Sequence, residues 1–186
     1  RDFADALLSN TYEELKRIYG RWNKRQLYDR NYSETRMPAM PSAIIETMSH
    51  QNFPDMRMGQ DPNFKFNMAR SIYKTILKYI CEQHNVQYVV SPLAPSEFRI
   101  SLDNGKATLK WNETEDTIET TAVPTGYIVY TSVGDNGYDN GTLVKNEKRF
   151  TTTLTPNKLY RFKVAAINRG GESFPTEELC AYYNPE

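Results

Sequence analysis

The sequence has no excess of charge and no long apolar segment. Its 186 residues carry 23 basic and 23 acidic side chains, so composition gives no electrostatic reason to expect nucleic acid or an anionic membrane as a partner. No apolar run approaches the ~20 residues that a membrane span needs. The chain opens on Arg1 and shows no signal peptide, so we expect it to be a piece of a longer precursor. No pattern indicates an oligomeric state.

Cysteine and histidine, the usual ligands of structural metals, are also scarce. Cys81 and Cys180 lie far apart and match no metal-ligand spacing. A disulfide between them is one alternative, and two free thiols, which are common when buried, are the other. His50 and His84 have no partner at metal-site spacing. We therefore expect no metal and no cofactor in this chain alone.

Aromatic residues, by contrast, are abundant. The chain contains 13 tyrosines, 8 phenylalanines and 2 tryptophans, a composition that disfavours disorder. Such a composition suits β-sandwiches and sugar-facing surfaces alike.

The first half shows helical periodicity in two places. Residues 3–19 have apolar side chains at helical spacing and are followed by Gly20, which suits a helix C-terminus. Asp61 and Pro62 provide an N-cap and a first-turn proline for a second helix, which should run to about Gln83. Its apolar stripe is Ala69, Ile72, Tyr73, Ile76 and Ile80. Between the helices we predict an extended segment at Tyr32–Arg36 and a polar loop at residues 47–60.

A short apolar run, Ser42–Ile45, stops abruptly at Glu46. A continuous apolar run of this length is typical of a strand covered on both faces. Glu46 would then lie at the carboxyl edge of a sheet, where open α/β folds bind ligands. The alternative is an ordinary solvated glutamate at a strand end. Two strands cannot make such a sheet alone, so residues 1–84 indicate an incomplete α/β segment with two main helices.

The spacing of the apolar residues changes from helical to alternating after a proline-containing linker at residues 85–95. From there, apolar and polar residues alternate, and turn signals such as Asp103–Gly105 separate the alternating segments. Closely spaced strands without intervening helices predict an all-β sandwich over residues 96–186. The predicted strands cover residues 98–102, 107–111, 127–131 and 160–166. The chain as a whole is therefore predicted to be an α+β two-part chain.

Several residues of the sandwich carry a resemblance to a known family. Trp111 would fill the core, and Leu154–Tyr160 fits a tyrosine corner, in which a phenol pins the loop before a core strand. With Pro124–Tyr127 and Val164–Gly170, these residues resemble the fibronectin type III family over residues 92–184. The resemblance implies a fold and a spacer or binding role without catalysis.

The first half resembles a different family. Arg36–Thr47 is proline-led and ends in a Glu-Thr pair, Asn52 and Asp55 follow, and Asp61–Phe64 opens the second helix. This order is similar to the C-terminal portion of zinc-dependent N-acetylmuramoyl-L-alanine amidases, over about residues 1–84. The family usually has Gly-Phe after the Glu-Thr pair, where this chain has Met48-Ser49.

The amidase resemblance implies a mechanism for the complete domain. A zinc ion held by two histidines and a glutamate polarises the amide carbonyl, and a second glutamate takes a proton from the attacking water. Only that second glutamate matches a residue here, Glu46, which is the one candidate catalytic residue. The zinc ligands would lie upstream of Arg1, so zinc is expected in the parent domain and not in this chain. His50 could face the same cleft, whereas His84 is expected at the surface.

These observations lead to two hypotheses of different classes. The first is the C-terminal fragment of a secreted, periplasmic or cell-surface peptidoglycan amidase with a fibronectin type III spacer. Its partner would be peptidoglycan or another cell-surface glycan. The alternative is a non-catalytic extracellular module that binds glycan or protein, such as the appendage of a polysaccharide-degrading enzyme. A His, a Glu and a His upstream of Arg1 would favour the amidase.

Overall fold

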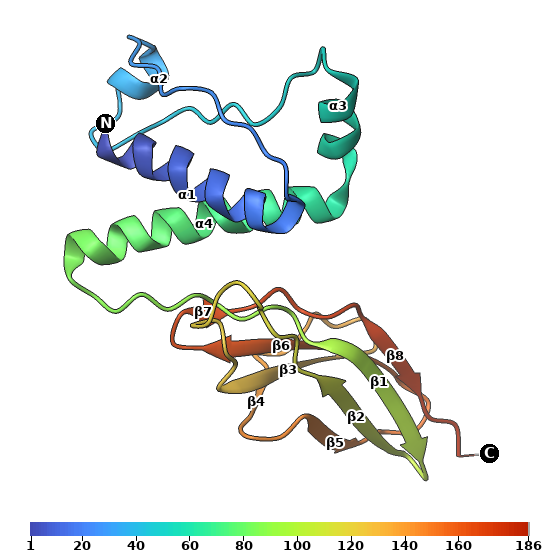
Figure 1. The fold of residues 1–186 in the computed structure, drawn as a ribbon. Coiled ribbons are helices and arrows are strands. Elements are labelled where there is room, and N and C mark those ends of the chain that lie inside the picture. Colours follow the sequence, from blue (N-terminus) through green and yellow to red (C-terminus); the bar gives the residue numbers. More distant parts are fainter. Residues whose placement is uncertain (186) are drawn as a thin grey trace. The chain divides into compact units, whose positions relative to one another are not determined.

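The computed structural model describes residues 1–185 and divides the chain into two compact units, Arg1–Tyr88 and Val89–Glu186. The boundary falls within the segment 85–95. Helices make up the first unit and strands the second, which confirms the predicted α+β two-part chain (Figure 1). The helices are α1 (Asp2–Tyr19), α2 (Ser33–Arg36), α3 (Phe53–Gln60) and α4 (Pro62–His84).

The two main helices occur where the sequence predicts them. α1 ends at Gly20, whose φ of 75° is readily adopted without a side chain and whose N–H donates to Lys16 O. α4 begins at Asp61, whose carboxylate accepts from the N–H of Asn63 at 2.9 Å, with Pro62 in the first turn. The left-handed Asn85 ends it.

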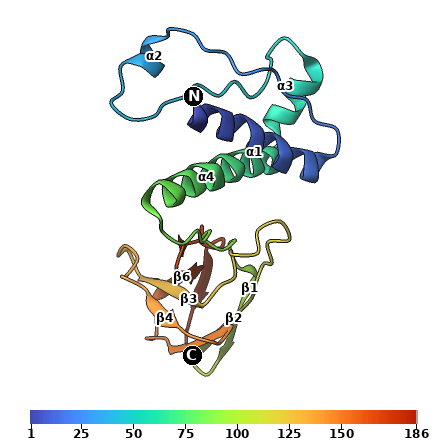
Figure 2. The same cartoon turned by 60° about the vertical axis from the view of Figure 1, so that its left-hand side comes forward.

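α1 and α4 lie side by side and enclose the small core of the helical unit (Figure 2). Leu15, Phe64 and Met68 are its buried residues. Tyr19 and Trp22 pack on Phe64, with ring centroids 5.8 Å and 5.6 Å from that of Phe64. At the other end of the helix pair, Phe3 packs on Tyr79 with ring centroids 4.9 Å apart, so aromatic side chains pack at both ends.

Polar side chains occupy much of the remaining buried surface of α1 and α4. Thr11 and Ser71 are buried, and their hydroxyl oxygens have no hydrogen-bond partner among the described residues. Nearby, the ammonium of Lys74 pairs with Glu14 at 2.6 Å, and the two side chains are only 6% and 16% exposed. Burying polar groups is less favourable than burying apolar ones, so this interface contributes less stability per area than an apolar one.

The apolar stripe predicted for α4 is largely exposed. Ala69, Ile76 and Ile80 are exposed, while Ile72 and Tyr73 are half-buried. The face turned toward α1 instead includes Phe64 and Met68, and it continues through polar residues.

Three local predictions for the helical unit are wrong. Residues 42–45 form no strand, and Ile44 and Ile45 are 51% and 40% exposed. A strand needs a neighbour for its backbone hydrogen bonds, and Arg1–Tyr88 contains no other strand. Tyr32–Arg36 includes the short helix α2 in place of an extended segment, and the loop at 47–60 contains α3, with Pro54 in its first turn.

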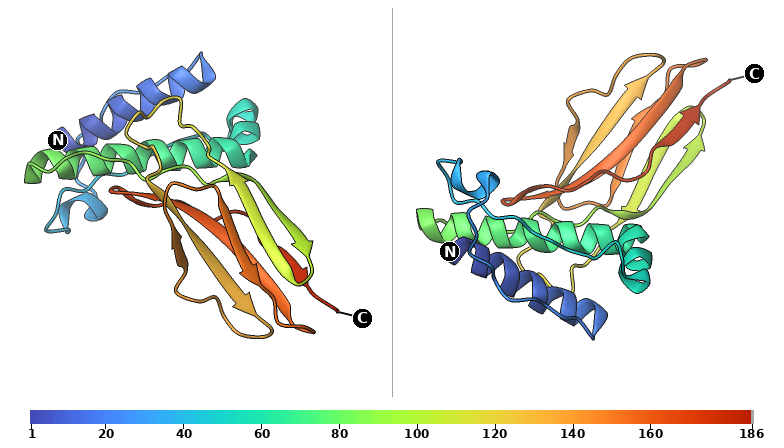
Figure 3. Two further views of the ribbon diagram at one scale, coloured as in Figure 1. Left: turned by 90° about the horizontal axis from the view of Figure 1, so that it is seen from below. Right: turned by 90° about the horizontal axis from the view of Figure 1, so that it is seen from above.

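The second unit is a sandwich of two antiparallel sheets (Figure 3). One sheet has the strand order β1-β2-β5, and the other has β4-β3-β6-β7, with β8 also paired to β6. The strands are β1 (Ser96–Asp103), β2 (Lys106–Asn112), β3 (Gly126–Val133), β4 (Thr142–Val144), β5 (Arg149–Thr153), β6 (Leu159–Asn168), β7 (Gly171–Glu172) and β8 (Leu179–Tyr182).

The sequence-predicted strands correspond to β1, β2, β3 and β6, so these four predictions are confirmed. β1 and β2 form a hairpin whose two turn residues, Asn104 and Gly105, have φ values of 45° and 72°. Positive φ at both turn residues matches the right-handed twist of the paired strands, and Asn-Gly is the sequence that tolerates it best.

A continuous apolar core fills the space between the two sheets. Trp111 is 1% exposed and meets the Tyr127 ring edge-on, with centroids 5.3 Å apart. Phe162 and Val164 on β6 are fully buried beside them. The tyrosine corner is present: the N–H of Thr155 donates to the Tyr160 hydroxyl at 3.0 Å. The predicted roles of Trp111 and Tyr160 are therefore confirmed.

The segment that enters the sandwich is anchored to it. Val90 is fully buried; its N–H donates to Thr121 Oγ1 at 3.0 Å, and its carbonyl accepts from the Asn168 amide at 2.8 Å. A side chain at Gly170 would collide with the backbone of Val89. A glycine therefore allows the entering segment to approach the end of β6 closely.

Candidate functional site

Glu46 lies on an irregular segment of the helical unit. Its side chain is exposed, as are those of Ile44 and Ile45 before it. The predicted position at the carboxyl edge of a sheet is not formed within Arg1–Tyr88, because this unit contains no strand. The carboxylate is accessible to solvent and to any molecule that approaches this segment.

The chain directly after Glu46 is held by Asp55. The Asp55 carboxylate accepts from the N–H of Ser49 at 3.0 Å, and the carbonyl of Asn52 accepts the N–H of Met56 as α3 begins. Met48 also packs against the small core of the helical unit. Asn52 and Asp55 therefore shape the backbone that follows Glu46.

The described residues do not make a zinc site. His50 is exposed beyond Glu46, and His84 is exposed at the end of α4. Across residues 1–185, no group of three or more His, Cys, Asp or Glu side chains could hold a metal ion. Cys81 is buried and Cys180 is exposed, and both are free thiols. The residues present do not fit the zinc ion of the amidase resemblance, so no metal-dependent step can be assigned to them.

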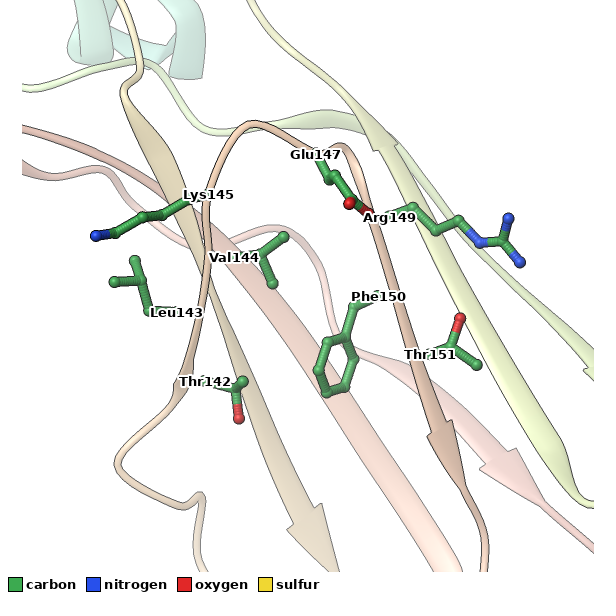
Figure 4. Close-up of a pocket in the computed structure, with 8 residues that line it drawn as sticks. All are labelled: Thr142, Leu143, Val144, Lys145, Glu147, Arg149, Phe150 and Thr151. Carbon is green, nitrogen blue, oxygen red and sulfur yellow. The ribbon is translucent and has the colours of Figure 1, made fainter.

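A shallow groove lies between the edge strands β4 and β5 of the two sheets (Figure 4). Val144 and Phe150 lie between the strands and pack against the core, while Lys145 and Arg149 point outward on opposite sides. The remaining lining residues are Thr142, Leu143, Glu147 and Thr151. Because its polar groups do not converge on a common point, the groove shows no catalytic arrangement.

The outer face of the β3–β6 sheet gathers two tyrosines that bind carboxylates. The hydroxyl of Tyr130 donates to Glu172 at 2.8 Å, and the hydroxyl of Tyr138 donates to Glu178. The Lys163 ammonium lies 5.0 Å from the centre of the Tyr138 ring. We call these five residues the tyrosine face.

Local contacts hold the tyrosine face in place. Lys163 pairs directly with Tyr130 across β3 and β6. Beside them, Arg161 donates to the carbonyl of Gly134 at 2.6 Å and so fixes the start of the loop that carries Tyr138. Gly141 closes that loop over Tyr130, where a larger residue would collide with the ring.

The same contacts raise the pKa of both phenols. For Tyr130, the hydrogen bond to Glu172 is the main cause, because an anionic acceptor favours the protonated phenol. For Tyr138, burial raises the pKa most, and the bond to Glu178 adds to it. Both hydroxyls therefore remain protonated donors throughout the neutral range.

Sequence reasoning identified Glu46 but missed the tyrosine face. Tyr130 alternates with core residues along β3, which is a detectable signal for an outward position. Its partner Glu172, however, lies 42 residues further along the chain. No spacing rule connects the two.

Comparison with known proteins identifies the second unit. Residues 93–180 match the family model described as "Fibronectin type III domain". The sandwich is therefore a fibronectin type III domain, as the resemblance implied. This family match lies outside the first half and gives no support to the amidase resemblance, and a comparison with curated proteins finds no match. Among residues 1–185, no helix is long and apolar enough to cross a membrane.

Solved structures similar to the chain also align over about half of it. "Myokine structure" has a TM-score of 0.42 and 20% identity, covering 50% of this chain and 99% of that one. The FN5 domain of Drosophila Lar has a TM-score of 0.41 and 18% identity, covering 51% and 99%. The FN1–FN3 domains of chicken CNTN1 have a TM-score of 0.46 and 15% identity, covering 53% and 34%.

Proposed function

We propose, on the premise that residues 93–180 form a fibronectin type III domain, that the chain is the C-terminal part of a secreted peptidoglycan amidase. Residues 1–84 would complete a catalytic domain that hydrolyses the amide between N-acetylmuramic acid and L-alanine. The fibronectin type III domain would act as a non-catalytic spacer or binding module.

The exposed apolar stripe of α4 is the observation that carries this proposal. Ile76 and Ile80 are 37% and 48% exposed, although α4 already packs against α1 on another face. A helix of an α/β domain covers a sheet with such a stripe. The apolar run before Glu46 is also exposed, and it would pair within that sheet. Both features support a larger α/β domain, and the order of motifs around Glu46 supports the amidase family.

Glu46 has the chemistry of a general base in this proposal. An ionised, accessible carboxylate can accept a proton from the water that attacks the amide carbon and then deliver it to the leaving amine. The hydrogen bond that the Ser49 N–H donates to the Asp55 carboxylate would hold the backbone next to Glu46. The remaining catalytic groups are assigned to the parent polypeptide upstream of Arg1.

The test is Glu46→Gln in the parent polypeptide, assayed on purified peptidoglycan. Glutamine keeps the shape and polarity but cannot accept the proton, so turnover should fall about 10²–10⁴-fold with the melting temperature unchanged. Glu82→Gln, another exposed glutamate of the helical unit, is the matched control and should retain full activity. Unchanged turnover in Glu46→Gln would end the catalytic role of Glu46.

The absence of a three-ligand cluster in residues 1–185 leads to a separate measurement on the 186-residue chain. Purified chain should contain no stoichiometric zinc, and added zinc should leave its melting temperature unchanged, because only a ligand that binds the folded state stabilises it. One tightly bound zinc per chain, lost in His50→Ala or His84→Ala, would refute this expectation.

The second candidate is a non-catalytic module that binds glycan or protein. The observation that favours it is the tyrosine face, since it lies on a domain that encloses its own core. If the parent binds peptidoglycan but releases no peptide from it, and Glu46→Gln changes neither result, this second candidate replaces the amidase.

A further inference from the structure

We propose that the tyrosine face of the fibronectin type III domain binds an uncharged polysaccharide chain. The proposal is independent of the amidase function, because each residue of the face belongs to the second unit. Tyr130 and Tyr138 would provide aromatic surfaces, and Lys163, Glu172 and Glu178 would provide hydrogen bonds to sugar hydroxyls.

The face is directed away from the core. Val129 and Val164, neighbours of Tyr130 and Lys163 in sequence, are fully buried between the sheets. Because side chains alternate along a strand, Tyr130 and Lys163 project from the opposite side. Tyr138, on the loop beside them, remains 37% exposed. Tyr138 is therefore the more accessible ring, while Tyr130 is half-buried beneath the loop at Gly141 and presents only its uncovered part.

The two rings are fixed before any ligand arrives. Each phenol hydroxyl is bound to a glutamate, and the Lys163 ammonium lies over the Tyr138 ring. Binding then requires little further loss of side-chain freedom, which is one of the main costs of association. An aromatic side chain held in this way presents a large contact area with only two rotatable bonds.

The hydrogen-bonding groups of the face match the rim of a sugar ring. Pyranoses expose C–H groups on their flat faces and hydroxyls around their edges. Aromatic rings complement the first, because their negatively charged π-faces attract weakly positive C–H groups. Glu172 and Glu178 are exposed and accept hydrogen bonds beside the rings, while Lys163 donates them. A polysaccharide can meet both requirements at once.

The charges around the face select an uncharged ligand. Arg161 and Lys163 face three carboxylates, those of Glu172, Glu178 and Asp139, the last of which accepts from the Thr131 N–H at 3.0 Å. There is no positive excess to attract an acidic polysaccharide, and like-charge contacts disfavour one. The tyrosine hydroxyls already donate to carboxylates, so they provide no additional donors for a polyanion.

The experiment measures binding of hexasaccharides to the complete 186-residue chain by isothermal titration calorimetry. The probes are N-acetylglucosamine and glucose hexamers, both β-1,4-linked, with a galacturonate hexamer as the anionic comparison. At least one uncharged hexamer should bind in the millimolar range or tighter, and the anionic hexamer should bind more weakly. Tyr138→Ala and Tyr130→Ala should each weaken that binding about 5–10-fold, as expected for the loss of an aromatic contact.

Tyr28→Ala is the matched control for a nonspecific tyrosine effect. Tyr28 is 53% exposed and has the Arg30 guanidinium 5.2 Å from its ring centre, but it belongs to the helical unit. Its removal should leave binding unchanged. Tyr138→Phe separates shape from hydrogen bonding, since it keeps the ring and loses the bond to Glu178; it should weaken binding less than Tyr138→Ala.

Each outcome decides the proposal. An unchanged far-ultraviolet circular dichroism spectrum and a retained cooperative melting transition must show that Tyr130→Ala and Tyr138→Ala remain folded; if either unfolds, Tyr138→Phe and Glu178→Gln test the hydrogen bond between Tyr138 and Glu178 instead. The proposal is overturned if neither uncharged hexamer binds, if the galacturonate hexamer binds more tightly, or if Tyr28→Ala weakens binding as much as Tyr138→Ala. None of these results depends on Glu46 or on amide hydrolysis.

Discussion

The two units of this chain bury different kinds of side chain. The sandwich encloses a continuous apolar core around Trp111 and Phe162, and both residues are at most 1% exposed. The helical unit buries a small cluster around Leu15 and Phe64, and beyond it several polar groups besides Leu7 and Cys81, while Ile76 and Ile80 remain exposed. Apolar periodicity is therefore not enough for an enclosed core. A second layer must be present to cover the apolar face.

The largest expected loss of stability comes from removing a core tryptophan of the sandwich, and it can be compared with the removal of a tryptophan in the helical unit. Trp111→Ala should destabilise the sandwich by about 3–5 kcal/mol, because a large buried aromatic leaves a cavity. Trp22→Ala should cost less, under about 2 kcal/mol, since Trp22 is only half-buried. Scanning calorimetry of the 186-residue chain follows the unfolding of both units in each variant. Equal losses in both units would remove the distinction drawn between them.

A smaller effect is expected at the polar interface of the helical unit. Lys74→Met should destabilise this unit by about 2–3 kcal/mol, because Glu14 loses its partner while remaining mostly buried. The double variant Glu14→Leu/Lys74→Met should recover most of the loss, since removing both charges also removes the desolvation penalty. Unfolding followed by circular dichroism at 222 nm provides the measurement. A double variant no more stable than Lys74→Met would show that the ion pair itself stabilises the helix packing.

The tyrosine corner should show a smaller effect again. Tyr160→Phe should destabilise the sandwich by about 1–2 kcal/mol, because the N–H of Thr155 loses its acceptor. Tyr182→Phe is the control: its hydroxyl bonds Asn157 at 3.2 Å on an exposed surface, so the change should cost under about 0.5 kcal/mol. Urea midpoints of the sandwich transition compare the two. Equal costs would mean that the corner bond has no special role.

Alkaline pH should weaken the sandwich by a modest amount. Burial of Tyr127 and Tyr138 and the carboxylate bond of Tyr130 raise the pKa of these phenols in the folded state. Stability from this source is complete below the unfolded pKa, about 10, and falls as the pH rises through the folded values. Tyr160 opposes the trend, because its hydrogen bonds with Thr155 lower its pKa.

The measurement is the melting temperature of the sandwich at pH 8 and pH 11. Because the double variant Tyr130→Phe/Tyr138→Phe lacks two of the three raised groups, it should lose less stability over this interval than the parent chain. A parent chain that loses no more than the double variant would contradict the assignment of the alkaline effect to the tyrosine face.

Local pattern was sufficient for the regular elements of both units. α1 and α4 are indicated by helical spacing, and their ends by Gly20 and Asp61, because these signals act within a few residues. The strands β1, β2, β3 and β6 are indicated by alternation and by turns such as Asn104-Gly105. α3 was missed although Pro54 marks its first turn, because its eight residues have little apolar periodicity.

The prediction of a strand at Ser42–Ile45 was wrong for a different reason. An apolar run shows that a segment can be covered on both faces, but a strand also requires a neighbour for its N–H and C=O groups. No neighbour exists within Arg1–Tyr88. The sequence could therefore identify Glu46 as a candidate residue without determining its surroundings.

What the sequence determined by itself is the division into a helical and a β unit, the ends of the main helices, and the core positions Trp111 and Tyr160. These follow from periodicity and caps, which depend on near neighbours. Tertiary structure alone decided which face of α4 packs on α1, and which carboxylates hold Tyr130 and Tyr138. Glu172 and Glu178 lie 42 and 40 residues beyond these tyrosines, so only the folded sheet brings each pair within hydrogen-bonding distance.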